Sequence, residues 1–411
     1  MLKGNAVVGQ SGGPTAAINA TLSGVIRGCA AKYTDGVINK LYGMRNGIEG
    51  FLAEDLVDLT CYFGDREWLN DLESTPAAAL GSCRKRLKDH KTDAETYEKI
   101  LEILKKYDIR YFFYIGGNDS MDTVLKLSDY AKDHDYELRV VGVPKTIDND
   151  LSATDHTPGF GSAAKFVATT VKEILRDINV YTVKAVTIVE IMGRDAGWLT
   201  ASAALPKISG GECPDLIYLP EHVFDLEKFI ADVTCALEKH PAVLVAVSEG
   251  IRDASGRYIG EGIDNGTVDA FGHKQLSGAG KVLEALVKER IGCKVRSIEL
   301  NLPQRCASHI ASATDIVESI SVGRAAVHFA TFGKTGIMAT IERDVSDGCY
   351  NATYSFADIS GIANAVKYVP REYINKEGNG ISEEGIEYLR PLIMGEIPVR
   401  YENGMPKHVI I

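Results

Sequence analysis

Long apolar runs are missing from this sequence of 411 residues. A transmembrane helix requires about 18 or more consecutive apolar residues. No run in the chain approaches that length, so no membrane span is expected. The first residues also lack the charged segment followed by an apolar segment that marks a secretory signal, which favours a cytoplasmic location.

Paired cysteines are also missing. The eight cysteines are scattered, no C-x-x-C pair occurs, and no spacing resembles that of a metal site. In a chain of this length such a distribution is typical of reduced thiols in a cytoplasm. The sequence therefore predicts neither a disulfide framework nor a structural zinc site.

Positive charge is in deficit. The chain has 45 Lys and Arg against 56 Asp and Glu, which gives a formal net charge of −11. Nucleic acids and anionic membrane surfaces are bound by clustered cations. We therefore expect no nucleic-acid partner and no membrane partner. A phosphorylated small molecule is not excluded, because a few convergent cations are enough to bind it.

Strand and helix patterns alternate along the chain, which indicates an α/β protein. Strands are expected at 5–10, 37–42, 111–115, 138–143, 184–191, 242–247, 295–300 and 336–341. Helices are expected at 94–107, 162–177, 281–291 and 323–332. There are too many strands for one sheet, and the length suits two or three domains. We expect two α/β lobes, each a mostly parallel sheet flanked by helices, with the active site in the cleft between them.

One stretch of seven residues, PKTIDND from Pro144 to Asp150, concentrates reactive side chains directly after an expected strand. Ligands of open α/β sheets bind beyond the carboxyl ends of the strands. On an extended segment Asp148 and Asp150 would point the same way, which suits one as a base and the other as a metal-binding or orienting group. Lys145 and Thr146 can contact a phosphate. The alternative interpretation is an Asx-rich surface turn.

Similar clusters of glycines and polar residues follow other expected strands or lie in turns. They are GGPT from Gly12, GSCR from Gly81, GGNDS from Gly116, MGRDAG from Met192 and SEG from Ser248. Glycine-rich turns before helices present free N–H groups to anions. Isolated arginines stand at 84, 194, 296 and 305, whereas Lys85 and Arg86 are interpreted as a solvated basic turn. Together these groups supply what phosphoryl transfer requires: positioning, cations, a metal and a base.

The motifs also occur together in one known family. SGG, GSCR, GGNDS, PKTIDND, MGRDAGW, SEG and a final QR run in family order from Gly12 to Arg305, and in this the chain resembles the 6-phosphofructokinases. The resemblance covers about three quarters of the chain. It implies a phosphofructokinase-like fold, with Mg²⁺ as cofactor.

Two positions indicate a branch of that family. The ATP-dependent enzymes have glycine where this chain has Asp119 and Lys145, and the pyrophosphate-dependent enzymes typically have Asp and Lys. An Asp side chain fills the space of the α-phosphate and repels its charge, while a lysine adds a cation for the charge-dense pyrophosphate. The resemblance therefore implies reversible transfer of a phosphoryl group from pyrophosphate to fructose 6-phosphate. The products are fructose 1,6-bisphosphate and phosphate.

The family motifs imply a role for each matching residue. Asp148 would be the base, Asp150 would assist it, and Thr146 and Arg194 would contact the transferring phosphoryl group. The implied diphosphate-binding residues are Gly13, Arg84, Asp119, Ser120 and Lys145. The implied substrate-binding residues are Thr146, Asp148, Met192, Gly193, Arg194, Glu249, Arg296 and Arg305. Mg²⁺ is expected at Asn118 and Asp119.

The resemblance also implies how the chain is divided. Residues 1–150 with about 306–350 are expected to form a larger N-terminal α/β lobe that binds the phosphoryl donor. Residues of about 151–305 with the C-terminal segment 351–411 are expected to form a smaller lobe that binds the sugar phosphate. Some sugar-phosphate cations in this family come from a neighbouring subunit, so a homodimer or homotetramer is implied.

Three departures from the family pattern leave questions open, one of them being Ala185, which stands near the position of an intersubunit arginine in the bacterial ATP enzymes. Asn118 stands where many members have an acidic residue linked to the metal, and Leu302 stands where the bacterial ATP enzymes have a substrate histidine. Alternatives are an ATP-dependent 6-phosphofructokinase with an unusual donor site and a pyrophosphate enzyme that acts on sedoheptulose 7-phosphate. A catalytically silent metabolite sensor is disfavoured, because Asp148, Asp150 and Arg194 are all present.

Overall fold

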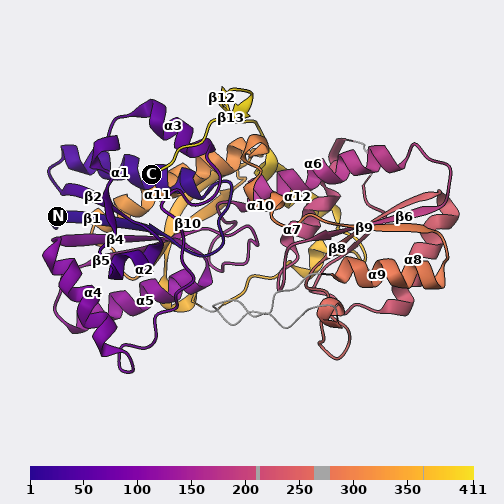
Figure 1. Cartoon of the computed structure of the whole chain (residues 1–411), viewed down its shortest axis with the longest axis horizontal. Helices are drawn as coiled ribbons and strands as arrows, with labels where there is room; N and C mark the ends of the chain where they lie inside the picture. The colour runs from indigo at the N-terminus through magenta and orange to yellow at the C-terminus, as the bar shows by residue number, and fades with distance from the viewer. Residues whose placement is uncertain (210–212, 263–277, 364) are drawn as a thin grey trace.

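Two large β-sheets lie toward opposite ends of the long axis of the molecule (Figure 1). The computed structural model describes residues 1–209, 213–262, 278–363 and 365–411. Within these ranges one sheet has seven strands in the order β11-β10-β5-β4-β1-β2-β3, and the other has four in the order β7-β8-β6-β9. The expected architecture of two α/β lobes is therefore confirmed.

The larger sheet is mostly parallel. Its strands are β1 (Gly4–Gln10), β2 (Ile38–Met44), β3 (Leu56–Asp58), β4 (Ile109–Gly116), β5 (Arg139–Pro144), β10 (Ile337–Asp344) and β11 (Asn351–Asp358). Only the edge strands β3 and β11 run antiparallel to their neighbours among these described strands. The register pairs Gln10 with Ile115 and Gly116 with Pro144, so the turns after β1, β4 and β5 meet at one edge of the sheet.

Helices cover both faces of the larger sheet. One face packs against α1 (Ile18–Thr34), α3 (Arg66–Ser74) and α11 (Ala313–Thr331), and the other against α2 (Gly47–Leu52), α4 (Ala94–Lys106) and α5 (Asn118–Asp133). Successive side chains of a strand point to opposite faces. Val8 and Phe113 accordingly join the first layer, while Val7 and Phe112 join the second. Burial on both faces explains the continuous apolar runs of the central strands.

The smaller sheet is parallel throughout. It contains β6 (Ala185–Ile191), β7 (Leu216–Tyr218), β8 (Ala242–Ser248) and β9 (Lys294–Glu299), and β9 lies at its edge. One face is covered by α6 (Phe160–Ile178), α7 (Trp198–Ala201) and α12 (Glu383–Leu389), and the other by α8 (Leu226–Lys239) and α9 (Ala279–Arg290). The turns after β6, β8 and β9 therefore share one edge, as in the larger sheet.

The short elements lie mainly in the connections. They are η1 (Thr60–Tyr62), η2 (Ser202–Ser209), η3 (Ile259–Gly262), α10 (Pro303–Cys306), η4 (Ser308–Ile310), η5 (Ile359–Gly361), η6 (Arg371–Tyr373), η7 (Arg390–Ile393), β12 (Tyr401–Glu402) and β13 (Met405–Pro406). In the described part of the chain, no helix has the length and apolarity needed to cross a bilayer. All eight cysteines are free thiols.

The structure corrects two expectations about the elements. The helix expected from residue 323 begins earlier, at Ala313. The segment 351–358, expected in the smaller lobe, forms β11 and pairs with β10 along its whole length in the larger sheet. β11 is an edge strand with alternating exposed and half-buried residues, so it lacks the apolar run that marks a central strand.

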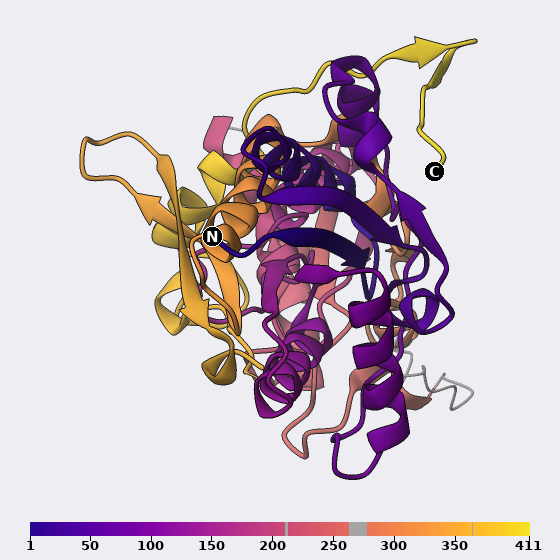
Figure 2. The same cartoon turned by 90° about the vertical axis from the view of Figure 1, so that its left-hand side faces the viewer.

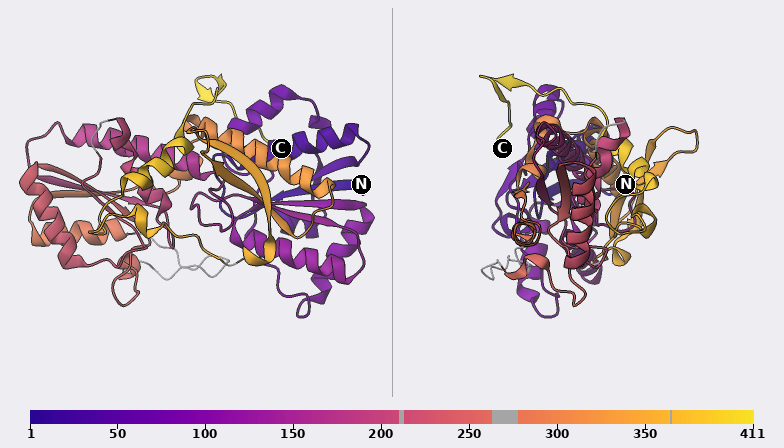
Figure 3. Two further views of the ribbon diagram at one scale, coloured as in Figure 1. Left: turned by 180° about the vertical axis from the view of Figure 1, so that it is seen from behind. Right: turned by 90° about the vertical axis from the view of Figure 1, so that its right-hand side faces the viewer.

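The C-terminal segment connects the two lobes. Val369, Ile374 and Leu389 pack in the core of the smaller lobe. The chain then returns to the larger lobe, where Arg400 lies 2.6 Å from Glu67 and the Val409 N–H donates to Thr75 over 2.9 Å. Figures 2 and 3 show this last segment, in yellow, running along the outside of the molecule.

Candidate active site

A cleft of about 810 Å³ opens where the strand ends of the two sheets face each other. Residues of the larger lobe form one side of the cleft, and residues of the smaller lobe form the other. The large-sheet wall comprises residues 12–15, 84, 86, 117–120, 145–148 and 150, and the small-sheet wall comprises residues 190–192, 194–196, 249, 299, 301, 302, 304 and 305. Most residues expected to bind or react line this cleft: Gly13, Arg84, Asn118, Asp119, Ser120, Lys145, Thr146, Asp148, Asp150, Met192, Arg194, Glu249 and Arg305.

Two glycine-rich turns are joined at the large-sheet wall. The Gly12 N–H donates to the Cys83 carbonyl over 3.1 Å, and the Ser82 hydroxyl donates to the Gly12 carbonyl over 2.6 Å. Gly12 has a φ of +77°, a conformation that L side chains rarely adopt. These bonds bring Gly13 and Arg84 to the same end of the cleft.

The N-terminus of α5 forms the adjoining part of this wall. A Cβ on Gly116 would lie 1.9 Å from the Ser120 hydroxyl oxygen, so the turn before the helix requires glycine. The first N–H groups of a helix have no partner within it and carry a partial positive charge. Because Asn118, Asp119 and Ser120 occupy the first turn, this part of the cleft can bind an anion.

Lys145 is a buried cation between the turns. The residue is only 3% exposed, and its ammonium donates to the Gly13 carbonyl over 2.6 Å. Burial lowers the pKa of Lys145 to about 8, although the charges of Asp148 and Asp150 oppose that change. The group is therefore mostly charged at neutral pH and lies beside the Gly12–Gly13 turn.

Asp148 and Asp150 both line the cleft, but the chain between them is not extended. Asn149 has a φ of +53°, so the turn is left-handed at that residue. The Asp148 N–H donates to the Thr146 hydroxyl over 3.1 Å. Burial, followed by the charge of Asp150, raises the pKa of Asp148 to about 7, while Lys145 and Arg194 oppose the shift. Burial also raises the pKa of Asp150.

Two turns are also interlocked at the small-sheet wall. The Gly193 N–H donates to Glu249 over 3.3 Å, and the Ser248 hydroxyl donates to the Gly193 carbonyl. A Cβ on Gly250 would lie 1.9 Å from the Arg194 carbonyl oxygen, which explains the glycine there. Burial raises the pKa of Glu249 to about 7. The MGRDAG and SEG motifs thus form one unit that brings Arg194 and Glu249 to the cleft.

Arg305 follows β9 in the chain, but it lies beside the large-sheet wall. A Cβ on Gly13 would be 3.4 Å from a terminal guanidinium nitrogen of Arg305. Burial and the nearby charge of Arg84 lower the pKa of Arg305. Together with Lys145, these two arginines concentrate positive charge at one end of the cleft.

Two predicted site residues do not line the cleft. Gly193 lies next to it and acts through its hydrogen bonds to Glu249 and Ser248. Arg296 lies on the edge strand β9, is exposed, and is separate from the residues that line the cleft. Within one chain, the structure therefore does not bring Arg296 together with the other candidate substrate-binding residues.

Several residues of the cleft were not predicted from the sequence. Arg86, interpreted as a solvated residue, is exposed, but it also lines the cleft, and its guanidinium lies 3.6 Å from the Asp122 carboxylate. The other missed lining residues include Thr15, Glu190, Asp195, Glu299 and Asn301. Glu190 and Glu299 lie near the ends of β6 and β9, next to recognised motifs. Their place near a strand end is the feature of the sequence from which they could have been predicted. Asp195 lies within the MGRDAG motif itself.

Comparisons with known proteins identify similar chains. The family described as Phosphofructokinase matches residues 5–330. The pyrophosphate–fructose 6-phosphate 1-phosphotransferase of Halomonas elongata is 42% identical over 99% of this chain and 96% of its own length. The protein of the same name from Xanthomonas campestris is 43% identical over 100% of this chain and 96% of its own. A crystal structure of a pyrophosphate-dependent phosphofructokinase from Nitrosospira multiformis is 39% identical, with a TM-score of 0.88 over 99% of this chain and 96% of its own.

Proposed function

The chain belongs to the phosphofructokinase family, and we propose that it transfers a phosphoryl group from pyrophosphate to the 1-hydroxyl of fructose 6-phosphate. The reaction yields fructose 1,6-bisphosphate and phosphate, and it is reversible. The oxygen of the sugar hydroxyl forms a bond to phosphorus, the bridging P–O bond of pyrophosphate breaks, and the hydroxyl proton goes to a base. Full-length similarity to enzymes with this name supports the assignment.

The observation that carries the donor assignment is the position of Lys145. Its ammonium is buried, bonded to the Gly13 carbonyl, and directed to the part of the cleft that also contains Arg305 and Arg84. A compact inorganic anion gains most from cations gathered at one end of a cleft. Asp119 at the first turn of α5 adds a negative charge that disfavours the additional phosphate of a nucleotide.

Asp148 acts as the general base for the sugar hydroxyl. A base is most effective when its pKa lies near the working pH, and the pKa of Asp148 is raised to about 7, first by burial and then by Asp150. Asp150 orients Asp148, and its negative charge repels the Asp148 carboxylate and so helps to raise the pKa of Asp148. In the reverse direction the protonated Asp148 returns the proton to the leaving sugar oxygen.

Arg194 and Thr146 contact the phosphoryl group during transfer. Charge is spread over the equatorial oxygens in the transition state, where a fixed cation and a hydroxyl donor are most effective. Both residues line the cleft with Asp148, and the charge of Arg194 acts on both Asp148 and Glu249. The charge of Arg194, on the small-sheet wall, therefore acts on Asp148 of the large-sheet wall, as expected for a residue that stabilises the transferred group.

The phosphate of the sugar is bound with help from a second subunit. Arg296 is exposed on an edge strand and is not among the described residues that line the cleft of its own chain. In a homodimer or homotetramer, an exposed arginine of one subunit can complete the site of another. Met192 and Glu249 of the small-sheet wall contact the rest of the sugar, whose hydroxyls need hydrogen-bond acceptors.

Mg²⁺ is the proposed cofactor, and the residues present fit it. The Asn118 side-chain oxygen is buried without a hydrogen-bond partner, and its amide nitrogen donates to Asp150 over 3.5 Å. Mg²⁺ is commonly held by one or two carboxylates together with substrate phosphates. Asn118 and Asp119 would hold the ion, which when bound neutralises charge on the phosphates. Among the described residues no cluster of three His, Cys, Asp or Glu forms a metal site by itself, consistent with a site completed by substrate.

A donor-specificity assay tests the proposal. The purified protein is given fructose 6-phosphate and Mg²⁺ with either pyrophosphate or ATP as the only donor, and formation of fructose 1,6-bisphosphate is measured. Activity with pyrophosphate alone is expected. Activity with ATP alone would overturn the donor assignment, and a preference for sedoheptulose 7-phosphate over fructose 6-phosphate would overturn the acceptor assignment.

A further inference from the structure

Lys367 lies behind the catalytic turn, and no family motif includes it. Its ammonium donates to the Asp155 carbonyl over 2.6 Å, and to the Thr154 carbonyl and the Asn149 side-chain oxygen over 3.2 Å each. An ammonium has three N–H donors, so these three oxygens use all of them. All three donors of the Lys367 ammonium are therefore bonded to protein oxygens, and Lys367 does not contact substrate.

The backbone of Lys367 joins the turns that carry the catalytic groups. Its N–H donates to the Asp150 carbonyl over 2.8 Å, and its carbonyl accepts from the Trp198 indole over 2.9 Å. Two residues later, the Val369 N–H donates to Glu221 over 2.9 Å, and the Gly197 N–H donates to the same carboxylate oxygen over 2.8 Å. The segment 366–369 thus connects the PKTIDND turn to the MGRDAGW turn.

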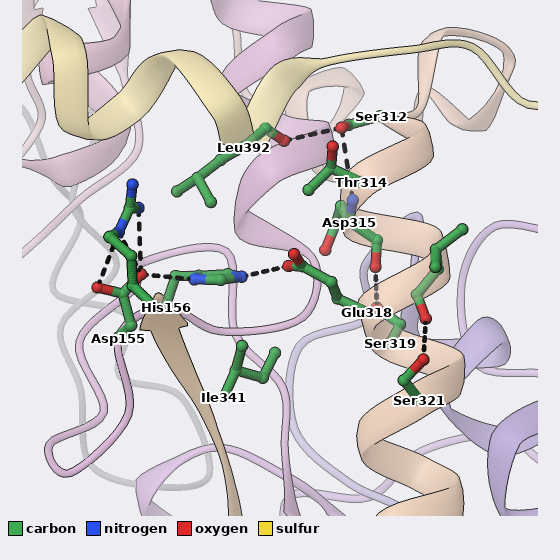
Figure 4. Close-up of polar contacts among 12 residues, drawn as sticks. Asp155, His156, Ser312, Thr314, Asp315, Glu318, Ser319, Ser321, Ile341 and Leu392 are labelled. Carbon is green, nitrogen blue, oxygen red and sulfur yellow. Dashed lines mark hydrogen bonds and ion pairs between the residues drawn. The ribbon is translucent and has the colours of Figure 1, made fainter. Parts of the chain in front are cut away.

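The oxygens around the ammonium are fixed from the opposite side. The Asp155 carboxylate is bonded to Arg343 over 3.1 Å and to His156 over 2.8 Å, and the other nitrogen of His156 lies 2.5 Å from Glu318 on α11. Figure 4 shows the His156 ring between the Asp155 and Glu318 carboxylates. Asp155 is thereby attached to a long helix of the larger lobe, so the Lys367 ammonium bonds to a rigid support.

We infer that Lys367 is a positioning residue, which holds the Asp148–Asp150 turn in its left-handed conformation and in a fixed relation to Arg194. The inference rests on the proposed function, because the groups it positions are the base and the cation of that reaction. Asn149 has a φ of +53°, which L residues adopt rarely unless a local bond supports it. Lys367 supplies that support through the Asn149 side chain and through the Asp150 carbonyl.

The main test compares two lysine variants. Lys367→Met removes the ammonium and keeps the apolar stem. Lys165→Met is the matched control, because Lys165 also bonds a carbonyl, that of Gly395 over 2.5 Å, away from the cleft. Lys367→Met should lower kcat on the order of 10²-fold with the KM of both substrates unchanged, since a small misplacement of reacting groups has effects of this size. Lys165→Met should keep the wild-type kcat.

Hydrogen exchange supplies a readout that needs no substrate. Lys367→Met should accelerate amide exchange in peptides covering residues 146–156, and Lys165→Met should not. If kcat stays at the wild-type value, or if exchange in these peptides is unchanged, Lys367 is not a positioning residue. A raised KM with an unchanged kcat would likewise overturn the inference, because it would mean a loss of binding alone.

A second variant keeps the inference testable if Lys367→Met does not fold. Trp198→Phe removes the donor to the Lys367 carbonyl and leaves the ammonium in place. It should lower kcat less than Lys367→Met, again with KM unchanged, and a wild-type kcat would contradict the connection between the two turns. A wild-type protein that does not use pyrophosphate would refute the proposed function instead, and the exchange measurement would still decide the role of Lys367.

Discussion

Both walls of the cleft carry carboxylates, including Asp119, Asp148 and Asp150 on the large-sheet wall, but the cations gather mainly beside that wall. The large-sheet wall presents Arg84, Arg86 and Lys145, and Arg305 lies against it. The small-sheet wall presents a set of carboxylates: Glu190, Glu249 and Glu299. Arg194 belongs to this second wall, but its charge acts on Asp148 of the first wall. One wall is therefore suited to a small, highly charged anion, and the other to a molecule rich in hydroxyl groups.

From this difference we infer which half of the proposed site is complete within one chain. Pyrophosphate needs cations and N–H donors, and the large-sheet wall supplies both. A sugar phosphate needs acceptors for its hydroxyls, which the small-sheet wall supplies, and also cations for its phosphate. Among the described residues Arg296 is an exposed arginine of the smaller sheet outside its own cleft. The acceptor half is therefore the one that we expect a neighbouring subunit to complete.

The largest effect should come from Asp148, the residue of the large-sheet wall on which the charge of Arg194 acts. Asp148→Asn keeps the size of the side chain but cannot accept the hydroxyl proton. We expect kcat to fall by roughly 10²–10⁴-fold, the usual contribution of a general base, while the KM of both substrates changes little. Steady-state kinetics in both directions measures this. A rate near that of the wild type would exclude Asp148 as the base.

The next effect should be confined to the large-sheet wall. Lys145→Gly removes the buried ammonium and should lower kcat/KM for pyrophosphate roughly 10- to 100-fold, the value of a lost charged hydrogen bond. The KM for fructose 6-phosphate should not change. Lys85 is an exposed lysine of the basic turn, so Lys85→Gly is the control and should behave as the wild type. If Lys145→Gly retains normal kinetics, the contrast between the walls does not determine the donor.

The same wall allows a gain of function to be sought. Asp119→Gly combined with Lys145→Gly removes the side chains that are expected to exclude the additional phosphate and the nucleoside. Activity with ATP should then become detectable in the assay described above. Its complete absence would show that space and charge at these two positions do not by themselves exclude ATP.

A smaller effect should appear at the acceptor half. Arg296→Ala should raise the KM for fructose 6-phosphate by about tenfold, equivalent to one lost ionic contact, and leave the KM for pyrophosphate unchanged. Mixed oligomers of Arg296→Ala and Asp148→Asn subunits should recover activity, because each can supply the group that the other lacks. Unchanged kinetics in Arg296→Ala would mean that the acceptor half is complete without it.

The strand-end motifs could be predicted because each depends on local sequence. Glycines at 12, 116 and 250 are required by a backbone conformation or by a close neighbour, and the polar residues beside them line the cleft. These motifs predicted the two-lobe fold and, together with the resemblance to the 6-phosphofructokinases, most of the candidate site.

Residues that reach the site through tertiary packing could not be found in the same way. Lys367 lies in a C-terminal segment without a motif, and only the path of that segment past Asp150 gives it a role. β11 was missed because an edge strand does not need an apolar run. Arg86 is exposed, as the interpretation of a solvated basic turn predicts, but the turn gives no sign that this arginine also lines the cleft.

The smallest effect concerns stability and follows from the pKa of Asp148. Its folded-state pKa is about 7, above the ordinary value of 3.8, so ionisation of Asp148 opposes folding. The contribution of this residue to stability is greatest below about pH 4, falls as the pH rises toward 7, and is constant above that. Asp148→Asn should therefore raise the midpoint of thermal unfolding at pH 8 by about 2 °C or more, and the gain should shrink as the pH is lowered.

Asp232→Asn provides the control of opposite sign on the outside of the smaller lobe. Burial raises the pKa of Asp232, but hydrogen bonds from Asn379, Tyr218 and Lys228 outweigh it, and the net pKa is lowered. Ionisation of this residue favours folding, so the variant should lower the unfolding midpoint at pH 8, with a loss that shrinks below pH 4. If the unfolding midpoints of both variants, relative to the wild type, changed with pH in the same direction, the pKa of Asp148 would not be raised in the folded protein. Changes in opposite directions would show that ionised Asp148 lowers the free energy of unfolding, because burial and the charge of Asp150 disfavour its carboxylate.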